Sequence, residues 1–217
     1  MLTWQLSQPK PSLVGAGLKR RRTGGQVFLL RAPSSAAVEG FIERARSETL
    51  SYAQLGMTGG PTPRGYTADH NRVLLGHGEA HFDRAVEALD SWAMFDLGWV
   101  TLHAASSPPT LSQVVVIEVR MPPIRSLMAA RVVSLVREAG PVRRHGFAYG
   151  TLDSHLERGE ERFLIEWDRA SDAVFYDLLA YSRPQHLLTW LGYPITRHCQ
   201  KAFARDSLEA MRQRLAS

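Results

Sequence analysis

The strongest constraint on the fold is a series of six segments between residues 99 and 182 in which polar and apolar side chains alternate. Because successive side chains of a strand point to opposite faces, this pattern predicts β-strands with one covered face. Turn residues such as Gly140-Pro141 and Asp153-Ser154 separate the segments, and links this short imply antiparallel neighbours. The predicted strands are Trp99–His103, Gln113–Arg120, Ala130–Arg137, Arg143–Leu152, Glu160–Asp168 and Ala173–Ser182.

Helical segments lie on both sides of this series. Apolar side chains at helical spacing predict helices at Ala36–Ser47, capped by Ser35, and at Glu79–Trp92. A third and longest helix begins near Pro194, a residue suited to a first helical turn, and ends near Leu215. An antiparallel sheet must cover one face, and this last helix alone is long enough to lie across it.

The segments before the strands complete the predicted order. A short β-type run at Gln26–Arg31 adds a seventh strand, and residues 55–78, rich in Gly, Pro and Thr, predict a long loop. Whether Pro61–His77 forms a lid is left open. The order predicts an α+β fold: a curved antiparallel sheet of about seven strands wraps the C-terminal helix, and two helices follow the first strand. This order is similar to the helix-grip fold of START domains, aromatic polyketide cyclases and the birch-pollen allergen, in which the gap between sheet and helix commonly becomes a ligand cavity.

Charge is concentrated at the N-terminal end of the 217-residue chain. Residues 1–38 hold six of the 26 basic side chains and no acidic one, which leaves 20 basic against 21 acidic side chains in the rest. We therefore predict a basic arm at residues 1–25 and a single domain at residues 26–217, and the near-neutral body argues against a nucleic-acid partner. The single cysteine excludes an internal disulfide, and no window approaches the ~18 apolar residues of a membrane span. These features predict a cytoplasmic protein.

The segment Arg144–Phe163 carries the most distinctive pattern. Small residues (Gly146, Ala148 and Gly150) form one face of its first strand, which usually indicates that a backbone, a helix or a ligand comes close. The opposite face presents His145, Phe147, Tyr149 and Thr151. The alternation alone leaves open which of the two faces lines a cavity.

Several short motifs resemble one protein family. They are Leu75-Gly76-His77-Gly78, Gly146-Phe147-Ala148-Tyr149-Gly150-Thr151-Leu152, Gly159-Glu160-Glu161-Arg162-Phe163 and Ser182-Arg183-Pro184. Over roughly residues 50–212 the chain resembles the bacterial and plant family known as domain of unknown function nineteen-ninety. The resemblance implies no catalytic residues, so candidates must come from the chain itself.

Glu161 is the leading candidate for acid–base chemistry. It shares a strand face with Phe163 and Trp167, and a carboxylate beside an apolar wall can have a raised pKa. Tyr149 and His145 lie on one face of the preceding strand and could orient a ligand carbonyl or hydroxyl with it. The alternatives are a glutamate in a surface salt bridge and an ordinary buried hydrogen-bond network.

Other side chains are candidates for ligand contacts. The predicted ligand-binding set is Phe147, Thr151, Phe163, Trp167, Tyr176, Ser182 and Arg183. Arg183 could clamp an anionic group or simply bridge the sheet to the last helix. His155 is expected in a solvated turn and Cys199 in helix packing. The spacing His77-x-Glu79-x-His81 departs from the zinc signature, so we expect neither a metal nor a cofactor.

Three functional hypotheses follow. The first is a protein that binds an apolar or amphipathic small molecule, such as a lipid, an isoprenoid or a polyketide-like compound, because aromatic side chains outnumber polar ones in the predicted cavity. The second is a cofactor-free acid–base enzyme, a cyclase, dehydratase or isomerase, that uses the same cavity. The third, and weakest, is an interaction protein that uses its basic arm.

Overall fold

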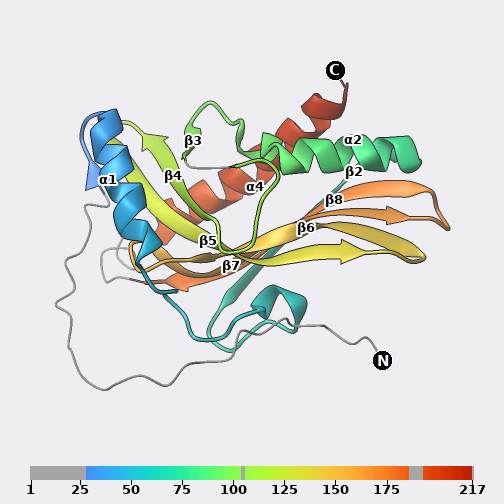
Figure 1. The fold of residues 1–217 in the computed structure, drawn as a ribbon, viewed down its shortest axis with the longest axis horizontal. Coiled ribbons are helices and arrows are strands. Elements are labelled where there is room, and N and C mark those ends of the chain that lie inside the picture. The colour runs from blue at the N-terminus through green and yellow to red at the C-terminus, as the bar shows by residue number, and fades with distance from the viewer. Residues whose placement is uncertain (1–27, 104–105, 186–192, 217) are drawn as a thin grey trace.

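The computed structural model describes residues 28–103, 106–185 and 193–216 (Figure 1). The predicted basic arm at residues 1–25 and most of the segment Pro184–Leu191 lie outside these described residues. In chain order the elements are β1 (Phe28–Leu29), α1 (Ser35–Arg46), the 3-10 helix η1 (Met57–Gly59), β2 (Thr67–His77), α2 (Glu79–Asp90), the 3-10 helix η2 (Ala93–Phe95), β3 (Val100–His103), β4 (Val114–Met121), β5 (Ile124–Glu138), β6 (Val142–Thr151), β7 (Glu157–Asp168), β8 (Ala173–Pro184) and α4 (Tyr193–Ala216).

The strands form one antiparallel sheet of eight strands in the order β2-β8-β7-β6-β5-β4-β3, with β1 paired to β5. Strands β3 to β8 follow one another in space as they do in sequence, as the short links between the alternating segments predicted. The meander, the two helices after β1 and the long C-terminal helix confirm the predicted helix-grip-like architecture. Helix α1 begins one residue before its predicted start because Ser34, and not Ser35, caps it by accepting a hydrogen bond from the Ala37 amide.

The prediction of a long loop at residues 55–78 is wrong for the second half of that segment. Thr67–His77 forms β2, an edge strand that pairs with β8 along most of its length. The segment is polar and only Val73 in it is fully buried, because an edge strand has a neighbour on one side only. A strand fixed in the sheet cannot serve as a lid, so the hypothesis of a lid at Pro61–His77 fails for this part.

Helices cover the two faces of the sheet unequally. Helices α2 and α4 lie on one face, which we call the inner face, while η1 lies below the opposite, outer face (Figure 1). The main hydrophobic core lies under the inner helices and includes a cluster of contacting aromatic rings: Trp92, Phe95, Phe147, Phe163 and Phe203. Helix α1 covers a smaller cluster over β4 and β5.

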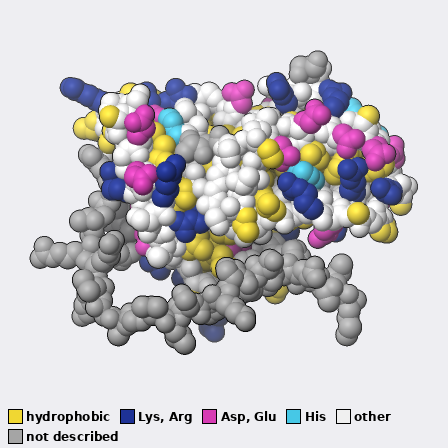
Figure 2. All heavy atoms as spheres, viewed as in Figure 1, with side chains coloured by type: hydrophobic (Ala, Val, Ile, Leu, Met, Phe, Trp, Pro, Cys, Tyr) yellow, Lys and Arg dark blue, Asp and Glu magenta, His cyan; other side chains and the backbone are white. Residues whose placement is uncertain are grey.

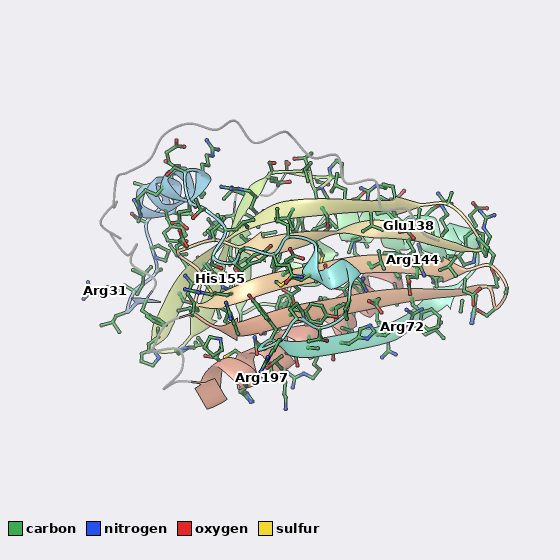
Figure 3. The ribbon with its side chains drawn as sticks, turned by 90° about the horizontal axis from the view of Figure 1, so that it is seen from below. Arg31, Arg72, Glu138, Arg144, His155 and Arg197 are labelled. Atoms are coloured by element: carbon green, nitrogen blue, oxygen red, sulfur yellow. The ribbon has the colours of Figure 1, made fainter. Side chains whose placement is uncertain are left out.

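The part of the outer face that no described helix covers carries a line of ion pairs. Glu166 on β7 pairs with Arg72 on β2 and with Arg144 on β6, whose Nε lies 2.6 Å from the carboxylate. Arg144 also reaches Glu138 on β5 at 2.9 Å, and the view from below shows these side chains along the strands (Figure 3). On the face drawn in Figure 2, basic and acidic side chains lie intermixed.

The small-residue face of β6 points outward, because the chain before β2 crosses the sheet there. A side chain at Gly150 would meet the hydroxyl of Tyr52, and one at Gly146 would meet the carbonyl of Phe163 on β7. The opposite face, with Tyr149 and Thr151, is therefore the inner one, which answers the question that the alternation left open.

Candidate functional site

A cavity of about 490 Å³ lies between the inner face of the sheet and α4. Its walls are largely apolar and come from β4, β5, η2 and α4; they include Phe95, Ile117, Val119, Met121, Met128 and Phe203. Polar side chains gather on the opposite wall, on β2, β6, β7 and β8: Asp69, Asn71, Tyr149, Thr151, Glu157, Glu161 and Ser182. The cavity is thus an apolar chamber with one polar wall.

Tyr149 and Glu161 form the centre of the polar wall. The hairpin register places them directly opposite each other on β6 and β7, and the Tyr149 hydroxyl donates a hydrogen bond to Oε2 of Glu161. Glu161 keeps some accessible surface because its carboxylate faces the cavity, while protein surrounds it on its other sides. The contact between these two predicted residues follows from strand pairing.

The surroundings of Glu161 disfavour its charged form. Burial raises its pKa to about 7, the nearby carboxylate of Asp69 acts in the same direction, and the hydrogen bond from Tyr149 opposes the shift. Burial, together with the charge of Glu161, also raises the pKa of the Tyr149 hydroxyl well above its ordinary value, so this group stays protonated. Near neutral pH Glu161 can therefore either donate or accept a proton.

A second glutamate, Glu157, lies four residues before Glu161 on the same face of β7. Burial raises its pKa to about 7, although Gln200 on α4 donates a hydrogen bond to its Oε2 at 2.5 Å. The amide of Gln200 also reaches Ser182 Oγ at 2.9 Å. The polar wall therefore holds two carboxylates, both of which titrate near neutral pH.

Arg197 links α4 to the edge of the sheet beside these glutamates. Its guanidinium binds Asp69 on β2 through both nitrogens, with Nη2 and Oδ1 2.7 Å apart, and donates to Gln200 at 2.6 Å. Bidentate pairs of this kind fix geometry (Figure 3 places Arg197 at the start of α4 beside the sheet). The network positions both the helix and the amide that contacts Glu157.

His155 is not solvated, contrary to the expectation for a turn residue. It is buried, lines the cavity, and its Nδ1 accepts a hydrogen bond from the backbone amide of Glu157 at 3.0 Å. Burial lowers its pKa to about 4, so the imidazole stays neutral at physiological pH. The turn between β6 and β7 folds inward, which places this side chain under protein.

Four of the predicted ligand-binding aromatics lie elsewhere on the inner face. Phe147, Phe163, Trp167 and Tyr176 are buried in the main core under α2 and η2, outside the lining of this cavity. The hydroxyl of Tyr176 forms a hydrogen bond with Oγ of Ser207 on α4, at a distance of 2.9 Å. These side chains are on the inner face of the sheet, as the cavity is, but the packed helices above them leave no open space there.

His145 and Arg183 are likewise not brought to the cavity. His145 lies opposite Ile165, four positions along β7 from Glu161, or roughly 13 Å at strand spacing. Its Nε2 contacts Asp90 of α2 at 2.9 Å instead. Arg183 points to the outer face and stacks over the ring of Tyr66, 4.7 Å from its centroid.

Sequence reasoning missed five polar residues of the site: Asp69, Asn71, Glu157, Arg197 and Gln200. The alternation of Asp69, Asn71 and Val73 was a usable signal for a strand face, hidden in a segment that the glycines and prolines marked as loop. The spacing of three residues from Arg197 to Gln200 places both on one side of a helix. Their contacts with β2 and β7 are long-range and have no local signature.

Comparisons with known proteins identify relatives over most of the chain. Residues 51–210 match the family described as Domain of unknown function (DUF1990). A UPF0548 protein of Dictyostelium discoideum is 34% identical over 210 residues, covering 88% of this chain and 97% of its own. A UPF0548 protein of Deinococcus radiodurans is 38% identical over 190 residues, covering 82% and 94%. The relatives therefore come from a bacterium and from a eukaryote, so they do not indicate a bacterial origin for this chain.

Solved structures show a more distant likeness. The crystal structure of Ara h 8.0201 aligns with 70% of this chain and 99% of its own, at 8% identity and a TM-score of 0.44. Among the described residues, no helix has both the length and the apolar character needed to cross a membrane.

Proposed function

Since the chain belongs to the family described as Domain of unknown function (DUF1990), we propose its function from the geometry of the site: the protein binds an apolar or amphipathic small organic molecule between the sheet and α4. The observation that carries this proposal is a preformed chamber of about 490 Å³ whose walls are largely apolar and whose polar groups converge on one side. Ligand sites of proteins have this size and makeup. Lipids, isoprenoids and polyketide-like compounds have the matching chemistry.

Filling the cavity tests the proposal. Ala180 on β8 lies between Asp69 and Glu161 in the sheet register and lines the cavity. Ala180→Phe should abolish the blue-shifted fluorescence that the uncharged apolar dye Nile red gains on entering an apolar chamber. Ala139→Phe, in an exposed turn, is the matched control and should leave the signal intact. Equal dye binding by both variants, with urea unfolding showing that both are folded, would rule out this cavity as the binding site.

A second candidate function is acid–base catalysis on a molecule in the same cavity, with Glu161 and Tyr149 acting on it. The observation that favours it is a buried carboxylate with a pKa of about 7 that bonds a tyrosine hydroxyl inside the chamber. Glu161→Gln separates the two functions. A binding protein should show no turnover with or without Glu161, whereas an enzyme should still bind its substrate and lose turnover by about 100-fold or more.

A further inference from the structure

The polar wall is unbalanced in charge, and this imbalance indicates the chemistry of the ligand. Three carboxylates face the same part of the cavity, on Asp69, Glu157 and Glu161. The guanidinium of Arg197 is already engaged with Asp69 through both nitrogens. Among the ion pairs of the described residues, none reaches Glu157 or Glu161. The wall therefore holds two acids next to an apolar space; the charge of Arg197 acts on Glu157, but neither glutamate has an ion-pair partner within the described residues.

Both glutamates have unused capacity to accept hydrogen bonds. Glu161 accepts from Tyr149 through Oε2, and Glu157 accepts from Gln200 through Oε2. Within the described part of the chain, the Oε1 atom of each has no hydrogen-bond donor. Both donors present are neutral, and a neutral donor compensates a buried carboxylate less well than a cation does. Among the described residues, no positively charged group donates a hydrogen bond to either glutamate.

A second observation also points to a ligand. Ser126 on β5 lines the cavity and is fully buried, yet its hydroxyl has no hydrogen-bond partner among the described residues. Buried hydroxyl groups are normally paired, because an unpaired one loses its bonds to water without replacement. This hydroxyl lies on a different strand from the two acids, with Met128 two residues further along its strand face. It offers a second, weaker polar contact on the opposite, apolar side of the chamber.

We propose that the cavity selects an amphiphile whose polar end is a protonated amine, bound at the acidic side of β7 that Glu157 and Glu161 form, with its apolar body against β4, β5 and α4. This inference rests on the proposed function and specifies its ligand class. An ammonium group has three donors and no acceptor, so it can donate to the free oxygen of either glutamate. An anionic ligand would meet two acids, and a neutral alcohol would supply one donor only.

The pH dependence follows from the groups that face the two glutamates. Those groups are Asp69 from β2, Tyr149 from β6, Tyr176 from β8, His155 from the preceding turn and Arg197 from α4. Of these, Tyr149 and Tyr176 keep their protons and His155 keeps its neutral form at pH 6 to 8. Because both glutamates ionise near pH 7 and an alkyl ammonium stays charged until about pH 10, binding of an amine should strengthen from pH 6 to pH 8.

Three amphiphiles of equal chain length test the proposal: decylamine, decanol and decanoate, each titrated calorimetrically into the full chain below its micelle concentration. At pH 8 decylamine should bind about 10-fold or more tighter than decanol, as expected for a charge-assisted hydrogen bond. In the double variant Glu157→Gln/Glu161→Gln the amine should lose that advantage, while the affinity for decanol changes by less than about two-fold. Glu87→Gln, which removes an exposed carboxylate on α2, should leave all three affinities unchanged.

The outcomes separate this inference from the proposed function. Decanol or decanoate binding as tightly as decylamine would overturn the choice of an amine and leave the apolar cavity as a binding site. An amine preference that survives in the double variant, with its fold verified by circular dichroism, would also overturn it. If none of the three binds, and Nile red gives no signal that depends on Ala180, the proposed function fails together with the inference.

Discussion

Replacing Glu161 by glutamine should stabilise the protein at alkaline pH. In the folded protein, burial raises the pKa of Glu161 from 4.5 to about 7, so the folded state binds this proton more tightly than the unfolded chain does. The stability that the folded protein gains from this tighter proton binding is fully present below pH 4.5, and it is lost as the pH rises through about 7. A shift of this size corresponds to about 3 kcal/mol, at 1.36 kcal/mol for each pH unit. Glutamine resembles the protonated acid and keeps an oxygen for the Tyr149 hydroxyl. Because it does not ionise, the variant does not lose stability as the pH rises.

Urea unfolding of the wild type and Glu161→Gln at pH 4.5 and pH 8 measures this effect. The free energies of unfolding should agree within about 1 kcal/mol at pH 4.5, and the variant should be more stable by about 3 kcal/mol at pH 8. Glu87→Gln corrects for the change in net charge. A variant that is less stable than the wild type at pH 8, or a difference that does not depend on pH, would refute the argument that Glu161 is destabilised by burial.

Two further substitutions test other parts of the account. Glu160→Ala should lower the free energy of unfolding by about 3 kcal/mol in urea, because the buried carboxylate accepts hydrogen bonds from the Tyr52 hydroxyl and from two backbone amides of residues 56–58; a loss below about 1 kcal/mol would contradict this anchoring role. His145→Leu should leave the affinity for Nile red unchanged, because His145 contacts Asp90 away from the cavity. A reduced affinity of this variant for Nile red, with normal stability in urea, would show that His145 contributes to the cavity after all.

The strand meander was predictable because each strand carries its own signal. Alternation along β6, β7 and β8 shows which side chains share a face, and the short turns require antiparallel neighbours. Strand β2 carries only a short alternation of this kind, Asp69, Asn71 and Val73, within a segment rich in Gly and Pro. As an edge strand it buries little, and its polar sequence resembles that of the loop before it. Its pairing with β8, from Thr67↔Ser182 to His77↔Ala173, joins segments far apart in the chain and is a tertiary contact.

The candidate site was predictable to the level of a strand face. Tyr149 and Glu161 meet because register pairs them, and that pairing can be derived from the hairpin. Phe147 and Phe163 have the same parity, but whether a position on that face meets a cavity or a helix depends on where α2 and η2 pack. The same limit explains His155, whose burial depends on how its turn folds against the sheet.

Native mass spectrometry tests the central claim, that the chamber between the sheet and α4 holds a small organic molecule. Protein purified gently from its own host would be weighed intact under native conditions and again after denaturation, beside Ala180→Phe prepared in the same way. The account predicts a reproducible excess mass on the native wild type that denaturation releases and Ala180→Phe lacks, and fragmentation of the released compound should reveal an amine. An excess mass that Ala180→Phe retains, or an unloaded wild type that also fails to bind Nile red and decylamine, would contradict it.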